Sequence, residues 1–276
     1  MFKGREMVIA TKHGKEKVLA PILERELGVK VIVPENFDTD RFGTFTDEVK
    51  REDDPLTTAR KKCFAGMEAT GCSLAIGSEG SFGPHPQLFF AACNEELLLL
   101  VDKENDLEIS CLNVSLQTNY GREIITGEEQ LLDFAAKCLF PSHLLILKIT
   151  DSATVKFIKG ISTWHDLLIY YRSYTGLKIE AETDMRAMHN PTRMEVIEQT
   201  AQKLVDKVQS YCPQCHLPGF GVVSSVPGLP CQLCGTPTHS VLNHRLKCSK
   251  CSYTENKPYP NGRKYEDPQF CLQCNP

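Results

Sequence analysis

The residues whose types and spacing most directly indicate chemistry are cysteines near the carboxyl end of the chain. The sequence of 276 residues contains 13 cysteines, and eight of them lie after residue 211 as four Cys-x2-Cys pairs. The pairs are Cys212 with Cys215, Cys231 with Cys234, Cys248 with Cys251, and Cys271 with Cys274. Each such turn points two thiolates at one metal, and two turns complete a tetrahedral site with no open coordination position. The spacing predicts two structural Zn²⁺ ions, with no catalysis at either ion.

The spacing does not determine which pairs share a metal. Sequential pairing joins the first pair to the second and the third to the fourth. Nested pairing joins the two inner pairs around a hairpin in residues 237–247, and a cross-braced arrangement alternates the pairs. All three arrangements are compatible with the sequence.

A second group of candidate residues surrounds a carboxylate between glycines. Ser78 and Glu79 stand between Gly77 and Gly80, where the backbone is unencumbered. A glutamate in this setting is a natural ligand for a hard cation such as Mg²⁺, or a general base. The alternative interpretation is a glycine-rich turn with one solvated acid.

Basic residues occur at three other places. The turn Thr11–Lys15, which includes His13, follows a predicted strand and opens a helix, which is where α/β folds bind anions. Arg60 and Lys61 lie on a predicted helix and face either solvent or a ligand. Further along the chain, Arg186 and Arg193 flank the start of a long helix, where they could hold a phosphate or pair with Glu182 and Asp184. The Thr11–Lys15 turn could equally be an ordinary solvent-exposed turn.

Hydrophobic patterning predicts the elements that position these residues. Residues 7–10 and 29–33 have the composition of buried strands, and residues 15–27 form an amphipathic helix between them. Residues 74–76 predict another strand, which runs into a turn at 77–86. Parallel strands deliver their following turns to one edge of a sheet, so the basic turn and the Glu79 turn should meet.

Other segments complete a mixed α/β body. Capping residues Asp54 and Pro55 predict a helix that ends at Gly71, and Asn190 with Pro191 predict a helix over 191–210. The remaining predicted elements are an antiparallel meander over 88–93, 97–102 and 107–114, a helix over 126–139, a strand over 143–149 and a helix over 164–174. We expect a mixed sheet with flanking helices in residues 1–211, followed by a small double zinc-ribbon-like domain in residues 212–276.

Charge and hydropathy narrow the classes of partner. Residues 212–276 carry six Lys or Arg and three Asp or Glu, a net charge of +3, whereas the whole chain has −4. Two four-thiolate zinc sites would turn this +3 into −1, so no nucleic-acid partner is expected. No apolar run approaches the roughly 18–20 residues that span a bilayer, and the first residues lack a secretory signal. We therefore expect a cytoplasmic protein with reduced thiols.

Several motifs resemble an uncharacterised, mainly bacterial family of domains of unknown function. They are Thr11–Glu16, Gly43–Thr46, the Ser-Glu-Gly-Ser-Phe-Gly-Pro-His-Pro run at 78–86, Asn190–Arg193 and the final Cys-x2-Cys-Asn-Pro. This resemblance covers almost the whole chain and implies no activity.

Residues 7–82 also resemble, more distantly, the inosine/xanthosine triphosphate pyrophosphatases that clear non-standard purine nucleotides. The similarity lies in the order of a Thr-containing turn, a basic helix with Ala59, and a strand ending in Ser-Glu-Gly. The resemblance implies a divalent cation at an acidic strand end. The corresponding positions here are Thr11, His13, Glu48, Lys61 or Lys62, and Glu79.

Two hypotheses of function follow. In the first, the chain is a Mg²⁺-dependent nucleotide phosphohydrolase: Glu79 and Glu48 hold the cation, and Lys15 with Arg60 or Lys61 neutralises the phosphates. In the second, it is a non-catalytic module that binds a nucleotide or a protein, with the zinc tail mediating protein contacts.

Overall fold

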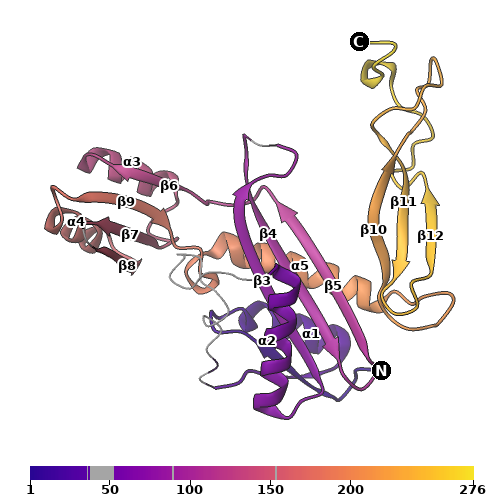
Figure 1. The fold of residues 1–276 in the computed structure, drawn as a ribbon, viewed down its shortest axis with the longest axis horizontal. Helices are drawn as coiled ribbons and strands as arrows, with labels where there is room; N and C mark the ends of the chain where they lie inside the picture. The colour runs from indigo at the N-terminus through magenta and orange to yellow at the C-terminus, as the bar shows by residue number, and fades with distance from the viewer. Residues whose placement is uncertain (36, 38–52, 89, 153) are drawn as a thin grey trace. The chain divides into compact units, whose positions relative to one another are not determined.

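The computed structural model describes residues 1–35, 37, 53–88, 90–152 and 154–276 (Figure 1). The chain forms two compact units: residues 1–104 with 110–203, and residues 105–109 with 204–276. One of the breaks between the units falls within the last long helix, after residue 203. In the described part of the chain, no helix has the length and apolar character needed to cross a membrane.

The first unit contains a mixed five-stranded sheet in the order β2-β1-β3-β4-β5. Its strands are β1 (Glu6–Ala10), β2 (Lys30–Ile32), β3 (Leu74–Pro84), β4 (Ala92–Asp102) and β5 (Leu107–Ser115). Strand β1 pairs in parallel with β2 and with β3, and the central strand β3 pairs with β4 in the antiparallel sense. The predicted mixed α/β class is therefore confirmed.

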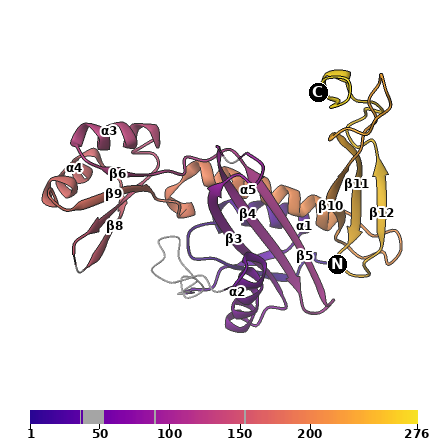
Figure 2. The ribbon, with the colours of Figure 1, turned by 45° about the horizontal axis from the view of Figure 1, so that its top comes forward.

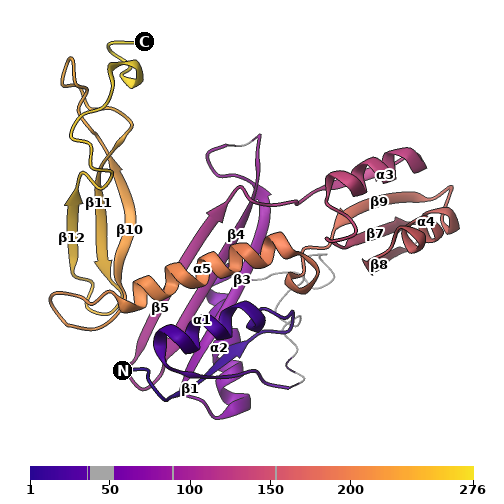
Figure 3. The same cartoon turned by 180° about the vertical axis from the view of Figure 1, so that it is seen from behind.

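Three helices cover this sheet: α1 (Glu16–Leu27), α2 (Pro55–Thr70) and α5 (Pro191–Gln209). Figure 1 shows α2 across one face, and Figure 3 shows α1 and α5 on the other. The caps of α2 are those that its sequence predicts. The Asp54 carboxylate accepts hydrogen bonds from the backbone N–H groups of Leu56 and Thr57, and Gly71 ends the helix in the left-handed conformation.

Strand β3 differs from its prediction, because it continues through the glycine-rich segment as far as Pro84 instead of ending at residue 76. Two of its glycines, Gly77 and Gly80, allow other groups to approach the strand closely and do not form a turn. A Cβ on Gly77 would lie 2.4 Å from the Ala59 carbonyl oxygen of α2, and one on Gly80 would lie 2.3 Å from an Arg193 guanidinium nitrogen. The partner strand β4 is also longer than predicted, since it joins two segments that the sequence analysis separated.

A four-stranded antiparallel sheet completes the first unit, in the order β6-β9-β7-β8 (Figure 2). Its elements are β6 (Arg122–Ile125), α3 (Glu128–Lys137), β7 (Leu145–Thr150), β8 (Val155–Ile161), α4 (Trp164–Ser173) and β9 (Lys178–Thr183). Side chains of α3, α4 and all four strands share one buried core. A short 3-10 helix, Ala187–His189, then leads into α5.

The second unit is built on an antiparallel sheet of β10 (Phe220–Pro227), β11 (Val241–Cys248) and β12 (Thr254–Pro258). A 3-10 helix, Pro268–Phe270, precedes the last cysteine pair. The first register pair of the β10–β11 ladder is Phe220 with Cys248, and the last is Pro227 with Val241. The two strands therefore connect the regions that hold the cysteine pairs.

Candidate functional site

The basic turn and the serine of the predicted site meet at the carboxyl end of β1. Ala10, the last residue of β1, is in register with Gly77, so Thr11–Lys15 passes beside the next residues of β3. The Lys15 ammonium donates a hydrogen bond of 2.7 Å to the Ser78 hydroxyl oxygen, and both side chains are buried. Parallel pairing thus brings together two groups that lie 63 residues apart in the sequence.

Lys15 lies in an environment that disfavours its charged form. Burial lowers its pKa to about 7, with a further contribution from the positive charges of Arg193 and Lys62, against the opposing effect of Glu96 and Glu79. Three cationic side chains and two carboxylates therefore share one buried region. An anion entering this region would restore the proton on Lys15.

Glu79 lies on the other face of β3 from Ser78, toward α2. Its carboxylate forms an ion pair with the Lys62 ammonium, and both side chains are almost fully buried. The buried Glu79 Oε1 takes part in this ion pair and makes no other hydrogen bond in the described part of the chain. A buried carboxylate oxygen without such a bond is compatible with a role as ligand to a hard cation.

Of the two lysines that the resemblance offered, Lys62 and not Lys61 lies at the site. Lys61 is on the exposed side of α2 and pairs with Asp53. Thr11 is buried at the end of β1, His13 lies in the basic turn, and Arg60 is partly exposed on α2. The predicted second acid, Glu48, lies outside the described residues.

Arg193 is at the site, but its charge is already matched by an acid that the sequence analysis did not select. Its Nε donates to Glu96 Oε1 at 2.6 Å, and neither side chain is exposed to solvent. The guanidinium also donates to the Met185 carbonyl oxygen and lies 5.1 Å from the centre of the Phe82 ring. Glu96 was recognisable as an acid next to the apolar run Leu97–Val101, since a charged group in a buried strand requires a partner.

Of the two interpretations of Arg186, phosphate binding and ion pairing, the structure shows the ion pair. The buried Asp184 carboxylate accepts hydrogen bonds from the Arg186 guanidinium and lies 2.9 Å from His189 Nδ1. These contacts lower the pKa of Asp184, although burial alone would raise it. Arg186 therefore helps to hold the segment that leads into α5.

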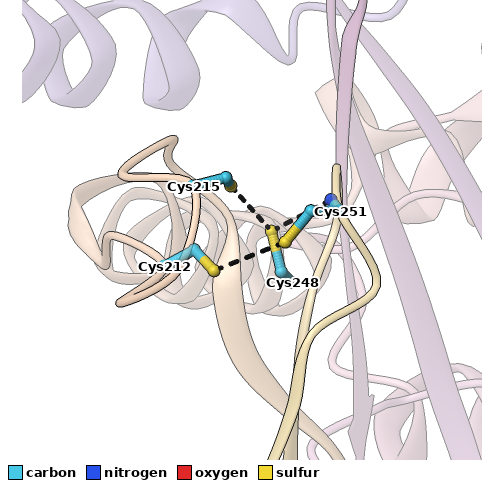
Figure 4. Close-up of side chains that lie close together, drawn as sticks. All are labelled: Cys212, Cys215, Cys248 and Cys251. Atoms are coloured by element: carbon cyan, nitrogen blue, oxygen red, sulfur yellow. Dashed lines mark hydrogen bonds between the residues drawn. The ribbon is translucent and has the colours of Figure 1, made fainter.

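The eight tail cysteines form two groups of four, each within the size of a metal site. Cys212, Cys215, Cys248 and Cys251 make one group (Figure 4), and Cys231, Cys234, Cys271 and Cys274 make the other. The first and third pairs thus alternate with the second and fourth, so the cross-braced arrangement is the one adopted. The direction of the strands explains it: β10 leads from the first group to the second, and β11 leads back.

Sulfur distances and hydrogen bonds fit a tetrahedral metal. Adjacent sulfurs lie 3.6 Å apart in the first group and 3.6 and 3.9 Å apart in the second. A Zn²⁺ ion with Zn–S bonds of about 2.3 Å requires sulfurs about 3.8 Å apart. Backbone N–H groups also donate to sulfur, as from Lys250 and Cys251 to Cys248, and such bonds favour the thiolate that binds metal.

Comparison with protein families gives one match, to DUF6671, a domain of unknown function, over residues 62–276. This match covers most of the chain. The chain belongs to the DUF6671 family. Searches of curated proteins and of solved structures gave no match.

The DUF6671 region includes Lys62, Ser78, Glu79, Arg193 and both cysteine groups, whereas Lys15 lies before it. The candidate site of the first unit is therefore completed by a segment outside the family match.

Proposed function

We propose that this chain binds a phosphorylated small molecule, most simply a nucleotide, beside Lys15 and Ser78 and hydrolyses it in a Mg²⁺-dependent step. The observation that carries the proposal is the buried contact between Lys15 and Ser78 at the end of two parallel strands, with Lys62 and Arg193 nearby. The carboxyl edge of such strands is where α/β folds bind phosphorylated ligands. Buried cations at that edge favour an anionic ligand.

Each side chain has a definite role in this proposal. Lys15 takes up a proton and binds an outer phosphate, and the Ser78 hydroxyl orients the same group. Glu79 holds the cation, which often needs only one or two protein carboxylates when phosphates supply the other ligands. A cation held there would supply charge neutralisation for the phosphates and a bound water for the hydrolysis. Thr11, His13, Arg60 and Glu48 remain proposed contacts, and a non-standard purine nucleotide remains the substrate that the resemblance suggests.

A specific observation favours a second candidate, the non-catalytic binding module. Glu79 already has its charge neutralised by Lys62, and a cation must displace this ion pair. If the ion pair persists with ligand bound, the same site binds an anion without hydrolysing it.

A screen of nucleoside triphosphates for phosphate or pyrophosphate release with Mg²⁺ separates the two candidates. On the hydrolase proposal, Glu79→Gln lowers turnover by about 100-fold or more while the chain still folds and keeps its zinc, although loss of the buried ion pair with Lys62 lowers its stability. Glu68→Gln, on the exposed side of α2, is the matched control and should keep full activity. Nucleotide binding without any release in the wild type would leave the binding module as the function.

The two cysteine groups are proposed to hold one Zn²⁺ ion each, in a structural role. The support is their all-thiolate donor set, which selects zinc among common cellular cations, and their closed geometry. A protein partner of this unit remains a proposal that follows from its small size and non-catalytic metal sites.

A further inference from the structure

One buried side chain of the first unit has polar atoms that find no partner among the described residues. Asn94, on β4, has no solvent exposure, and within the described residues neither its amide nitrogen nor its amide oxygen makes a hydrogen bond. Buried amides are almost always satisfied, because an unpaired donor or acceptor loses its bonds to water without replacement. An apolar side chain of the same size would be more stable at this position. The amide therefore indicates a partner other than the described residues.

Asn94 lies on the same sheet face as the buried charges of the site. It is in register with Phe82, and residue pairs that face each other across two strands project to the same side. The next pair on this face is Gly80 with Glu96, where Arg193 binds, and the pair after that contains Ser78, which accepts from Lys15. Ser78 and Phe82 are about 13 Å apart along the strand, at roughly 3.3 Å per residue. This length is comparable to that of a nucleotide with its phosphates at Lys15 and its base at Asn94, and such a ligand would require the buried Arg193–Glu96 pair between these ends to move aside.

The neighbours of Asn94 suit a flat heterocycle. Phe82 stacks on Tyr120, with ring centres 5.8 Å apart and planes inclined by 24°, and Arg193 lies near the Phe82 ring. Tyr120 belongs to the segment between β5 and β6. The face of Phe82 that stacks on Tyr120 is a flat surface on which a nucleobase could stack in place of Tyr120.

We propose that Asn94 reads the base of the nucleotide bound at this site. The side-chain amide presents a donor beside an acceptor, which matches the adjacent acceptor and donor on the edge of a nucleobase. The base displaces Tyr120 from Phe82 and pairs with the amide, while the phosphates lie at Lys15. This inference rests on the proposed nucleotide function and adds the residue that distinguishes a nucleotide from a bare polyphosphate.

The test compares Asn94→Leu with Asn113→Leu. Asn113, on β5, is also buried, but its amide nitrogen donates to Thr200 and its amide oxygen accepts from Lys203. Dissociation constants are measured by calorimetry for inorganic tripolyphosphate and for nucleoside triphosphates of four bases, with Ca²⁺ in place of Mg²⁺ to slow turnover. Melting temperatures of the unliganded variants are measured in parallel.

We expect Asn94→Leu to melt at or above the wild-type temperature and to bind the preferred nucleoside triphosphate about tenfold or more weakly, with tripolyphosphate binding unchanged. Asn113→Leu should melt lower and keep the wild-type ratio of the two affinities. Unchanged nucleotide affinity in Asn94→Leu, or an equal loss for tripolyphosphate, would overturn the role of Asn94. A wild type that binds neither probe would instead overturn the proposed function, and this inference with it.

Discussion

At the scale of single residues, Lys15 couples the candidate site to pH. Its pKa in the folded chain is about 7, against an ordinary value of 10.5. The unfolded chain therefore holds more protons between these two values, so the contribution of Lys15 to the free energy of unfolding rises with pH across this window. Below about pH 7 the lysine is charged in both states, and the penalty for burying its charge is fully present.

This coupling predicts the pH dependence of anion binding. An anion beside Lys15 favours the ammonium, so binding above pH 7 takes up a proton and weakens as the pH rises, by at most about tenfold per pH unit. Sulfate is a suitable probe because its own charge is constant over this range. Calorimetric titrations between pH 6 and 9 should show weakening above about pH 7 in the wild type.

Two substitutions serve as controls for this titration. Lys15→Met should bind sulfate weakly at every pH, whereas Lys61→Met, which removes an exposed lysine paired with Asp53, should keep the wild-type dependence. A wild-type affinity that stays constant from pH 6 to 9 would contradict the assignment of Lys15 as the anion ligand.

At the scale of elements, β3 is shaped by what packs on its two faces. Gly77 allows α2 to approach on one face, and Gly80 leaves room for the Arg193–Glu96 pair on the other. Gly83, on the same strand, has no atom within 4 Å of the position of a Cβ. The three glycines therefore have different tolerances for a methyl group, although the sequence alone does not distinguish them.

This difference gives a matched pair of variants. Gly80→Ala should destabilise the first unit by about 1–3 kcal/mol, because the added methyl overlaps a buried guanidinium that is held by Glu96 and by the Met185 carbonyl oxygen. Gly83→Ala should change the free energy of unfolding by no more than about 0.5 kcal/mol. Urea denaturation, followed by a signal from the first unit, measures both values. Equal effects of the two substitutions would show that Arg193 does not pack against Gly80 as described.

The elements also show which parts of this fold are predictable from sequence. Helix ends depend on a few adjacent residues, so Asp54 and Pro55 located the start of α2, and Asn190 caps α5 through a hydrogen bond from the Arg193 backbone N–H. The length of β3 depends on pairing with β4, which follows it in the chain, and glycines in a paired strand look like glycines in a turn.

The contacts of the candidate site likewise include some that local sequence predicts and others that it does not. Lys15 and Ser78 were predicted to meet because parallel pairing of their strands follows from local patterning. The partner of Arg193 was not predicted, since Glu96 lies 97 residues away in the chain and is selected only by the packing of α5 on β4. Burial of charge is a tertiary property, and no local spacing encodes it.

At the scale of the whole molecule, the second unit depends on its cysteines in a way that the first unit does not. Within residues 212–276, the buried apolar side chains are only Phe220, Leu229 and the cysteines Cys212, Cys231, Cys248 and Cys271. A core of this size does not offset the conformational entropy of ordering the segment. Metal binding is therefore expected to supply the folding free energy of the second unit, and chelation should unfold it while the first unit keeps its sheets.

Zinc content in double variants tests both the metal and the cross-braced arrangement. Cys212→Ser with Cys251→Ser removes two ligands from one group, so about one Zn²⁺ ion per chain should remain. The double variant Cys212→Ser with Cys231→Ser removes one ligand from each group, so neither group should retain zinc firmly. Elemental analysis of protein purified without chelator measures these contents, with Cys111→Ser, outside both groups, as the control that keeps about two ions. Sequential pairing predicts the reverse order for the two variants, and nested pairing predicts loss of both ions in each. Only retention of about one ion by the Cys212/Cys251 variant, together with loss of both by the Cys212/Cys231 variant, agrees with strands that lead from one metal group to the other and back.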